Sequence, residues 1–362
     1  MSAIPIVRPS HPALEDFEAD FNASLESGVV TNDGPWVRMF EAALTEYLGI
    51  PTIAFCNGQS ALMAMLAASD VRGGEVVLPS FTFCATPHAV EWAGATPRFA
   101  DIDEKTLCMN EESCHARVGP RTKAILGVDP YGILWEPPLY QGGSIKVLSD
   151  SAPSFGSRKL RKGSGSDAKI FSFHATKPFS TMEGGALCSH DLDLINRAKR
   201  IRNFGQDASG DCDEPGINGK MMEICAIIGL RQFDRWGDAR DARVDHAEEL
   251  AGALDGIPGL KVIDAPGGQS PIWLYRPVLI QKEFGMSRDS VVQALKRFDI
   301  HVRTYYRPCH QLSQYKHMNV SLPVTERIAS QVIALPIFND MKSSEIDRIA
   351  SALKNLQSGG GY

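Results

Sequence analysis

The sequence has no long apolar run, no excess of basic residues and no recognisable export signal. No window of its 362 residues approaches the roughly 20 consecutive apolar residues that cross a membrane. Residues 1–5 lack the charged and apolar segments of a secretory signal. The net charge is −6 at pH 7, which argues against a nucleic-acid partner. We therefore expect a cytoplasmic protein with neither a membrane nor a nucleic acid as its partner.

One local run of basic residues stands apart from this acidic balance. It covers residues 158–162, Arg-Lys-Leu-Arg-Lys. A solvated loop is the favoured interpretation, and attraction of an anionic substrate such as a nucleotide diphosphate is the alternative.

Cysteine is present, but not in the spacing of a metal site or a disulfide framework. The eight cysteines are scattered and form no CxxC pair. Cys114 and His115 are adjacent, yet no second ligand pair follows at zinc spacing. We predict no metal site, and free, mostly buried thiols in a reducing compartment.

Short apolar runs alternate with helical patterns through the first half of the chain. This alternation predicts parallel strands joined by crossover helices, which is an α/β fold. In such sheets, ligands bind outside the carboxyl ends of the strands. We expect strands at 53–55, 75–78, 96–99, 124–128, 145–148 and 169–172, and helices at 13–25, 37–48, 61–68 and 87–93.

The second half of the chain has a different pattern, and the length is enough for two domains. Residues 221–254 have helical spacing, with a break expected near Trp236 and Gly237. We predict three regions. They are a large domain over 1–240, a smaller α+β domain over 241–357 that ends in a helix at 343–356, and a flexible tail over 358–362.

A lysine, a serine and an aspartate occupy positions that suit pyridoxal 5′-phosphate (PLP). Lys177 precedes a proline, which favours a turn or extended backbone able to present its amine. Ser172 and Asp150 each end an apolar run. In PLP enzymes a lysine forms a Schiff base, an acid pairs with the ring nitrogen and a hydroxyl holds the phosphate. Alone, Lys177 would be a surface lysine and Asp150 a helix N-cap; together they predict a PLP site.

Two further segments suit the phosphate and the ring of this cofactor. Gly58, Gln59 and Ser60 open a helical run after a short strand, so their backbone N–H groups would form an anion site. A tight turn with an N-cap is the alternative reading. Phe83 is the candidate to stack on the ring and Phe81 is the alternate, although either residue alone would more often belong to the core.

These segments, in their order along the chain, carry a resemblance to a known family. They are Asn57-Gly58-Gln59-Ser60-Ala61-Leu62, Leu78 to Thr86, Asp101-Ile102-Asp103, Ser172-Phe173-His174 with Lys177, Glu183-Gly184-Gly185-Ala186, Arg202-Asn203-Phe204-Gly205 and Asn218-Gly219-Lys220-Met221. The chain resembles the DegT/DnrJ-type aminotransferases, which are PLP enzymes of fold type I that make amino sugars on nucleotide carriers. The resemblance implies a large domain with a mainly parallel seven-stranded sheet and a small C-terminal α+β domain.

The resemblance also implies a reaction and further site residues. An amino group would move from an amino acid, expected to be L-glutamate, to a keto sugar carried on a nucleotide. Asn218 would reach the phosphate of the other subunit, which makes a homodimer with shared active sites. His310 would lie near the sugar, unless it is a surface loop residue, and Tyr305 and Tyr306 would help to select the sugar.

Other functions remain open at this point. The same scaffold serves fold type I lyases, aldolases and cyclitol aminotransferases, and it also serves non-catalytic PLP-binding proteins. Some relatives carry histidine in place of the lysine and dehydrate sugars, and Lys177 argues against that branch.

The chain departs from the family pattern at several positions. Asp129 and Pro130 replace the usual histidine before a Tyr-Gly pair, and Pro153 stands where histidine or glutamine usually follows Ala152. The stretch from residue 132 to 149 is short, so part of a crossover helix is expected to be missing. Gln59 and Lys220 stand where threonine and arginine are usual. These departures predict a divergent subgroup with an altered substrate pocket.

Overall fold

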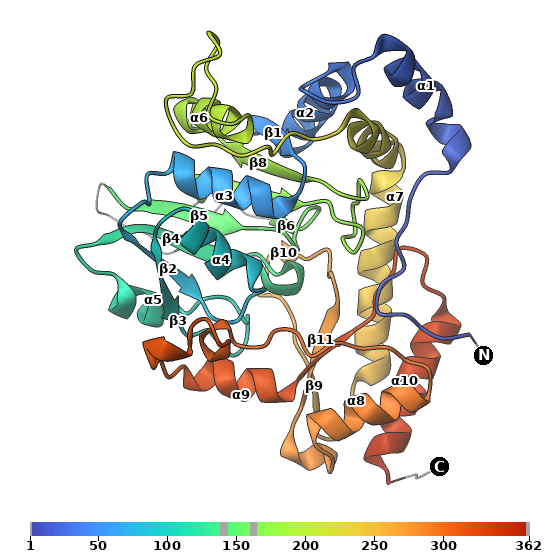
Figure 1. Cartoon of the computed structure of the whole chain (residues 1–362). Helices are drawn as coiled ribbons and strands as arrows, with labels where there is room; N and C mark the ends of the chain where they lie inside the picture. Colours follow the sequence, from blue (N-terminus) through green and yellow to red (C-terminus); the bar gives the residue numbers. More distant parts are fainter. Residues whose placement is uncertain (1, 138–143, 160–164, 360–362) are drawn as a thin grey trace.

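A computed structural model describes residues 2–137, 144–159 and 165–359 of the chain (Figure 1). Within them, seven strands form one sheet in the order β1-β8-β7-β5-β4-β2-β3. Only β8 runs antiparallel to its neighbours, which confirms the predicted α/β class with a mainly parallel sheet. The strands are β1 (Thr52–Phe55), β2 (Glu75–Pro79), β3 (Thr96–Ala100), β4 (Thr122–Val128), β5 (Lys146–Asp150), β7 (Ala168–Ser172) and β8 (Gly185–Ser189).

Helices cover both faces of this sheet because successive strand side chains point to opposite sides. Ile53 and Phe55 join the core beneath one set of helices, whereas Ala54 between them joins the core on the other face. The first face is covered by α3 (Gly58–Ala68), α4 (Ala85–Trp92) and α6 (Leu192–Arg202), and the second by α2 (Pro35–Leu48) and the start of α7 (Glu223–Leu254). Two short helices, α1 (Glu18–Ser27) and α5 (Glu111–Arg117), lie at the edges (Figure 1).

Helix α7 continues for 32 residues without interruption, so the predicted break near Trp236 and Gly237 is wrong. Trp236 is buried and packs on Phe155 and Phe179. Gly237 has open space around it, so this glycine costs the helix only its low propensity, about 1 kcal/mol. Tertiary packing of the tryptophan outweighs that cost. The predicted domain boundary at residue 240 falls inside this helix, and the division into domains stays a prediction.

The C-terminal part of the chain adds a second, smaller sheet. Three described strands pair antiparallel in the order β12-β11-β9. Their bounds are β9 (Leu260–Val262), β11 (Arg276–Ile280) and β12 (Val332–Leu335), and the adjoining helices are α8 (Arg288–Arg297), α9 (Pro323–Gln331) and α10 (Ser343–Gln357). A separate two-stranded pair, β6 (Arg158–Lys159) with β10 (Gln269–Ser270), joins the β5–β7 connection to the segment that precedes β11.

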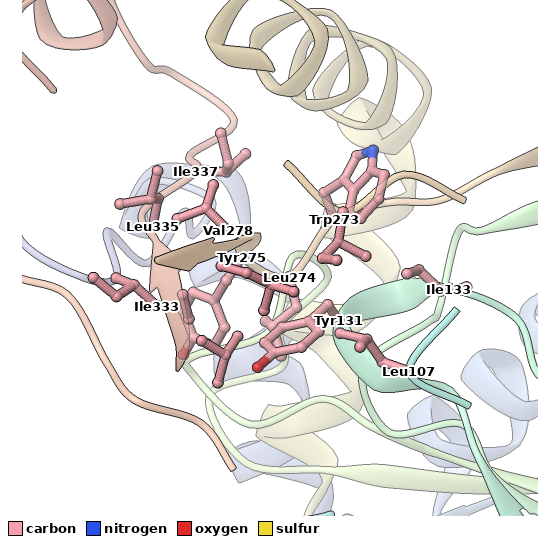
Figure 2. Close-up of a cluster of buried hydrophobic side chains, with 14 of the residues drawn as sticks. Leu107, Tyr131, Ile133, Trp273, Leu274, Tyr275, Val278, Ile333, Leu335 and Ile337 are labelled. Carbon is pink, nitrogen blue, oxygen red and sulfur yellow. The ribbon is translucent and has the colours of Figure 1, made fainter. Parts of the chain in front are cut away.

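A continuous apolar core joins the two sheets. Tyr131 and Ile133, from the connection that follows β4, lie against Trp273 and Leu274, which precede β11 (Figure 2). The backbone N–H of Leu274 donates to the Tyr131 carbonyl oxygen at 2.8 Å. We call this contact the seam, meaning residues 131–133 and 272–275. It places the 272–275 segment beside the carboxyl ends of the large sheet.

The connection between the parallel strands β4 and β5 contains no α-helix among its described residues. Residues 129–137 hold only the 3₁₀ turn Pro130–Gly132. Trp135 folds back over β4 instead: a Cβ atom built on Gly127 would lie 1.9 Å from its ring. The Trp135 indole can therefore lie directly on the strand only because residue 127 is a glycine, since any larger side chain there would clash with the ring. This agrees with the short crossover expected from the sequence.

No helix in the described ranges combines the length and the apolar character needed to span a bilayer. The same residues hold no cluster of three or more His, Cys, Asp or Glu side chains able to bind a metal ion. Leu160, Arg161 and Lys162 of the basic run, and residues 360–362 of the predicted tail, lie outside the described residues.

Candidate active site

A cavity of about 420 Å³ opens at the carboxyl ends of the parallel strands. Strand β5 ends there in Asp150 and β7 in Ser172, while α3 begins there at Gly58. Predicted site residues share its wall with several that the sequence did not single out. Its lining includes Gly58, Gln59, Thr82, Phe83, Val128, Asp150, Ala152, Pro153, Ser172, His174, Lys177, Glu183, Leu274, Tyr275, Tyr305 and Tyr306.

Asp150 is a buried acid held by two hydrogen bonds. Its Oδ2 accepts from the Thr86 hydroxyl at 2.8 Å, and its Oδ1 accepts from the backbone N–H of Ala152 at 3.2 Å. The Thr86 hydroxyl lies 2.8 Å from that of Thr82, so a short chain of hydroxyls connects the acid to the cavity. Burial raises the pKa of Asp150 above its ordinary value, and the hydrogen bond from Thr86 and the Lys177 amine oppose that rise.

Lys177 enters the cavity from a tight turn. Its backbone N–H donates to the His174 carbonyl oxygen at 2.8 Å, and Pro178 follows it. Removal of water from the amine lowers the pKa of Lys177 to about 8, although the Asp150 carboxylate acts in the opposite direction. A substantial fraction of this amine is therefore neutral near physiological pH, as a nucleophilic lysine requires.

The start of α3 forms a close approach between the helix and β7. A Cβ atom built on Gly58 would lie 2.8 Å from the Ser172 Cβ, so only glycine fits without a shift. The Asn57 side chain accepts from the Ser60 backbone N–H at 2.8 Å. That bond occupies one of the N–H groups expected to face an anion. Gly58, Gln59 and Ser172 line the cavity, and anion binding by their backbone N–H groups and hydroxyl stays a prediction.

The two candidate stacking rings have different positions. Phe83 lines the cavity with 57% of its surface exposed, whereas Phe81 is buried and packs edge-to-face on Tyr306 at a centroid distance of 5.4 Å. Phe83 is thus the ring that an incoming ligand would cover. Phe81 supports the aromatic floor formed by Tyr306 and Tyr131.

Three predicted site residues are absent from the wall of the cavity. Ser60 has its N–H capped, as described above. His310 is buried below the end of β2: its Nδ1 lies 2.7 Å from the Ser80 hydroxyl and its Nε2 3.3 Å from Glu326. Its burial contradicts the reading of His310 as a surface loop residue, and its place near the sugar stays a prediction. Asn218 is exposed and pairs through its backbone with Asn203.

Sequence reasoning missed several residues with polar groups at or beside the cavity, among them Thr82, Thr86, His174 and Tyr275. Thr82 precedes α4 and Thr86 lies in its first turn, and the four-residue spacing of these two hydroxyls was an available signal. Tyr275 carried no local signal. His174 sits three residues before Lys177; its Nδ1 accepts from the Thr176 backbone N–H at 3.2 Å, and its Nε2 lies 3.5 Å from Glu183.

The chemistry of this wall fits PLP. A helix start with a serine hydroxyl suits its phosphate, and a buried carboxylate suits its cationic ring. An amine with a lowered pKa suits its aldehyde. The close approach of Gly58 to Ser172 brings backbone N–H groups and hydroxyl to one edge, as a phosphate requires.

Comparisons with known proteins agree with this chemistry. The model of the DegT/DnrJ/EryC1/StrS aminotransferase family matches residues 13–354. A dTDP-4-amino-4,6-dideoxy-D-glucose transaminase of Shigella dysenteriae is 31% identical, over 97% of this chain and 98% of the relative. A UDP-N-acetyl-3-dehydro-alpha-D-glucosamine 3-aminotransferase of Acidithiobacillus ferrooxidans is 32% identical, over 92% of this chain and 91% of the relative. The crystal structure of DesI with its TDP-sugar product superposes with a TM-score of 0.92 at 32% identity, over 99% of this chain and 94% of DesI.

Proposed function

This chain belongs to the DegT/DnrJ/EryC1/StrS aminotransferase family, and from that premise we propose that it moves an amino group from L-glutamate to a keto sugar carried on a nucleotide, with PLP as its cofactor. The observation that carries the proposal is the meeting of Lys177, Asp150 and the Gly58–Ser172 edge in one cavity. The names of the matched relatives, which act on dTDP- and UDP-linked sugars, support the substrate class.

Lys177 and Asp150 carry the chemistry. When bound, PLP supplies an aldehyde that accepts amines and a ring that withdraws electrons. The neutral Lys177 amine would hold PLP through its aldehyde, and the same amine would take up and return the proton at the substrate carbon. The Asp150 carboxylate keeps a proton on the ring nitrogen. Its burial strengthens that interaction because little water competes for the charge.

The remaining wall residues bind and orient. Backbone N–H groups of Gly58 and Gln59, with the Ser172 hydroxyl, hold the phosphate. Phe83 covers one face of the ring. Tyr305 and Tyr306, from the C-terminal part of the chain, line the same cavity and would offer hydroxyl and ring surfaces to the sugar.

A second copy of the chain completes this proposal. Asn218 is exposed in the single chain, and the nearby Phe204 and Met222 leave 48% and 53% of their surfaces exposed. Apolar exposure of this kind beside a polar loop suits a partner subunit. We place Asn218 at the phosphate of that partner, in a homodimer with shared active sites. All eight cysteines are free, which suits a cytoplasmic enzyme.

The test supplies PLP, L-glutamate and a panel of nucleotide-linked keto sugars, and follows 2-oxoglutarate and the amino sugar. One-to-one formation of both products is the expected result, and it separates transamination from lyase or aldolase chemistry and from passive PLP binding. Lys177→Ala should abolish turnover while the protein still binds PLP. Near-normal turnover by this variant, or borohydride trapping of PLP on another lysine, would contradict the proposal.

A further inference from the structure

Asp129 is a buried acid at the end of β4 that the proposed reaction does not use. Its side chain is only 2% exposed. Three uncharged groups donate to it: the hydroxyls of Ser151 and Ser154 reach Oδ2 at 2.7 Å each, and the backbone N–H of Trp135 reaches Oδ1 at 2.8 Å. A buried carboxylate is costly unless hydrogen-bonded, and here three donors meet that cost.

The two serines bracket the segment that forms the cavity wall beside the catalytic acid. Ala152 and Pro153, which lie between them, both line the cavity. The N–H of Ala152 is also one of the two hydrogen-bond donors to Asp150. Asp129 therefore fixes both ends of the turn formed by residues 151–154. The middle of this turn supplies the Ala152 N–H that donates to Asp150.

The backbones of the two acids are joined as well. The Asp129 N–H donates to the Asp150 carbonyl oxygen at 3.2 Å, at the point where β4 and β5 end side by side. Trp135, anchored on Asp129, covers Gly127 on the same strand. Asp129 thus links the connection between β4 and β5, the ends of these two strands and the cavity wall.

We propose that Asp129 is a positioning residue for the cofactor site: its carboxylate locks the Ser151–Ser154 turn and so holds the Ala152 N–H on Asp150 and the Pro153 ring against the ligand. The two departures at positions 129 and 153 then belong to one arrangement. In this arrangement, Pro153 gives the cavity wall a rigid apolar surface, and Asp129 holds the turn that contains it.

The inference rests on the proposed function, because it concerns how PLP is held. Two variants separate anchoring from charge. Asp129→Ala removes the acceptor from all three donors. Asp129→Asn keeps an acceptor for Trp135 and can donate to both serine oxygens, whose hydrogens can turn to the Ser149 hydroxyl at 3.2 Å and the Ser151 carbonyl at 3.1 Å.

Asp101→Ala is the matched control. Asp101 is a similarly buried acid at the end of β3, and its oxygens accept from the N–H groups of Ile102, Val324 and Thr325 and from the Thr325 hydroxyl. It does not line the cavity. Its loss should lower stability through the same kind of broken hydrogen bonds without disturbing the turn beside Asp150.

The experiment titrates PLP into each cofactor-stripped variant and records the dissociation constant, the visible circular dichroism of bound PLP and the melting temperature. We expect Asp129→Ala to weaken PLP binding about tenfold or more, the effect of losing one fixed hydrogen bond to a charged group, and to diminish the dichroism. Asp129→Asn should stay within about threefold of the wild type. Asp101→Ala should melt earlier but keep the wild-type dissociation constant and dichroism.

The possible outcomes are distinguishable. If Asp129→Ala and Asp101→Ala lose stability alike and bind PLP alike, Asp129 is only structural and the inference is wrong. If Asp129→Ala does not fold, Ser154→Ala, which removes one of the three donors, must show the same loss of dichroism in smaller measure; an unchanged signal overturns the inference. A wild-type protein that binds no PLP contradicts the proposed function itself and this inference with it.

Discussion

Replacing Thr86 with valine should destabilise the cofactor-free protein, and the part of the cost that depends on Asp150 can be separated from the loss of the Thr82 contact. The change keeps the shape of the side chain and removes the hydroxyl that donates to Asp150 at 2.8 Å. Thr86 and Asp150 are both buried, so water cannot replace the lost donor. A hydrogen bond to a charged group is worth about 1.5–3 kcal/mol, whereas one between neutral groups is worth about 0.5–1.5 kcal/mol.

The assay is urea unfolding of cofactor-free protein at pH 7, in a double-mutant cycle with Asp150→Asn. Thr86→Val should cost about 1.5–3 kcal/mol with Asp150 present and about 0.5–1.5 kcal/mol with asparagine there. Thr86→Ser, which keeps the hydroxyl, is the control. Equal costs in the two backgrounds would refute the charged hydrogen bond that we place at the centre of the site.

The sign of the pH dependence provides a second check on the same pair. The Thr86 hydrogen bond lowers the pKa of Asp150, so its loss should raise that pKa further. Because the pKa in the folded state already lies above its ordinary value, Asp150 favours unfolding as pH rises through the interval between the two values. Thr86→Val should extend this interval upward. Its cost should therefore shrink in acid, where Asp150 is protonated, and a cost that grows in acid would contradict the assignment.

Two further predictions concern the lysine and the start of α3. Reductive trapping of a small aldehyde on Lys177 should rise with pH around a midpoint of about 8, where ordinary lysines titrate near 10.4; a midpoint above 10 would contradict the desolvated amine. Gly58→Ala should weaken PLP binding at least tenfold by forcing the helix start away from Ser172. Gly119→Ala, where a new Cβ meets nothing within 4 Å, should leave the dissociation constant unchanged.

The sheet and the centre of the site could be predicted because their signals are local. Each strand is a short apolar run, and parallel strands bring their carboxyl ends to one edge. This rule predicts that Asp150 and Ser172 meet, and the cavity contains both. Lys177 lies on the same edge, in a turn closed by the hydrogen bond from its N–H to the His174 carbonyl oxygen.

The supporting residues could not be predicted because their contacts cross between distant segments. Thr86 reaches Asp150 over 64 residues, and His310 reaches Ser80 over 230. No periodicity or spacing encodes such pairs; they follow from how α4 and the C-terminal segment pack beside β2. The prediction of a break in α7 was wrong for a related reason. Helix propensity is a local quantity, and it does not include the packing of Trp236 on distant residues such as Phe155.

The seam described above bears on how this enzyme could be re-engineered. Tyr131 contributes its carbonyl to Leu274, and its ring lies among aromatic side chains supplied by the C-terminal part of the chain. A chimaera that joins the amino-terminal half of one homologue to the carboxy-terminal half of another would mismatch this shared packing. To exchange specificity between relatives, both segments of the seam, residues 131–133 and 272–275, should therefore be transplanted together. Helix α7 should come from a single parent.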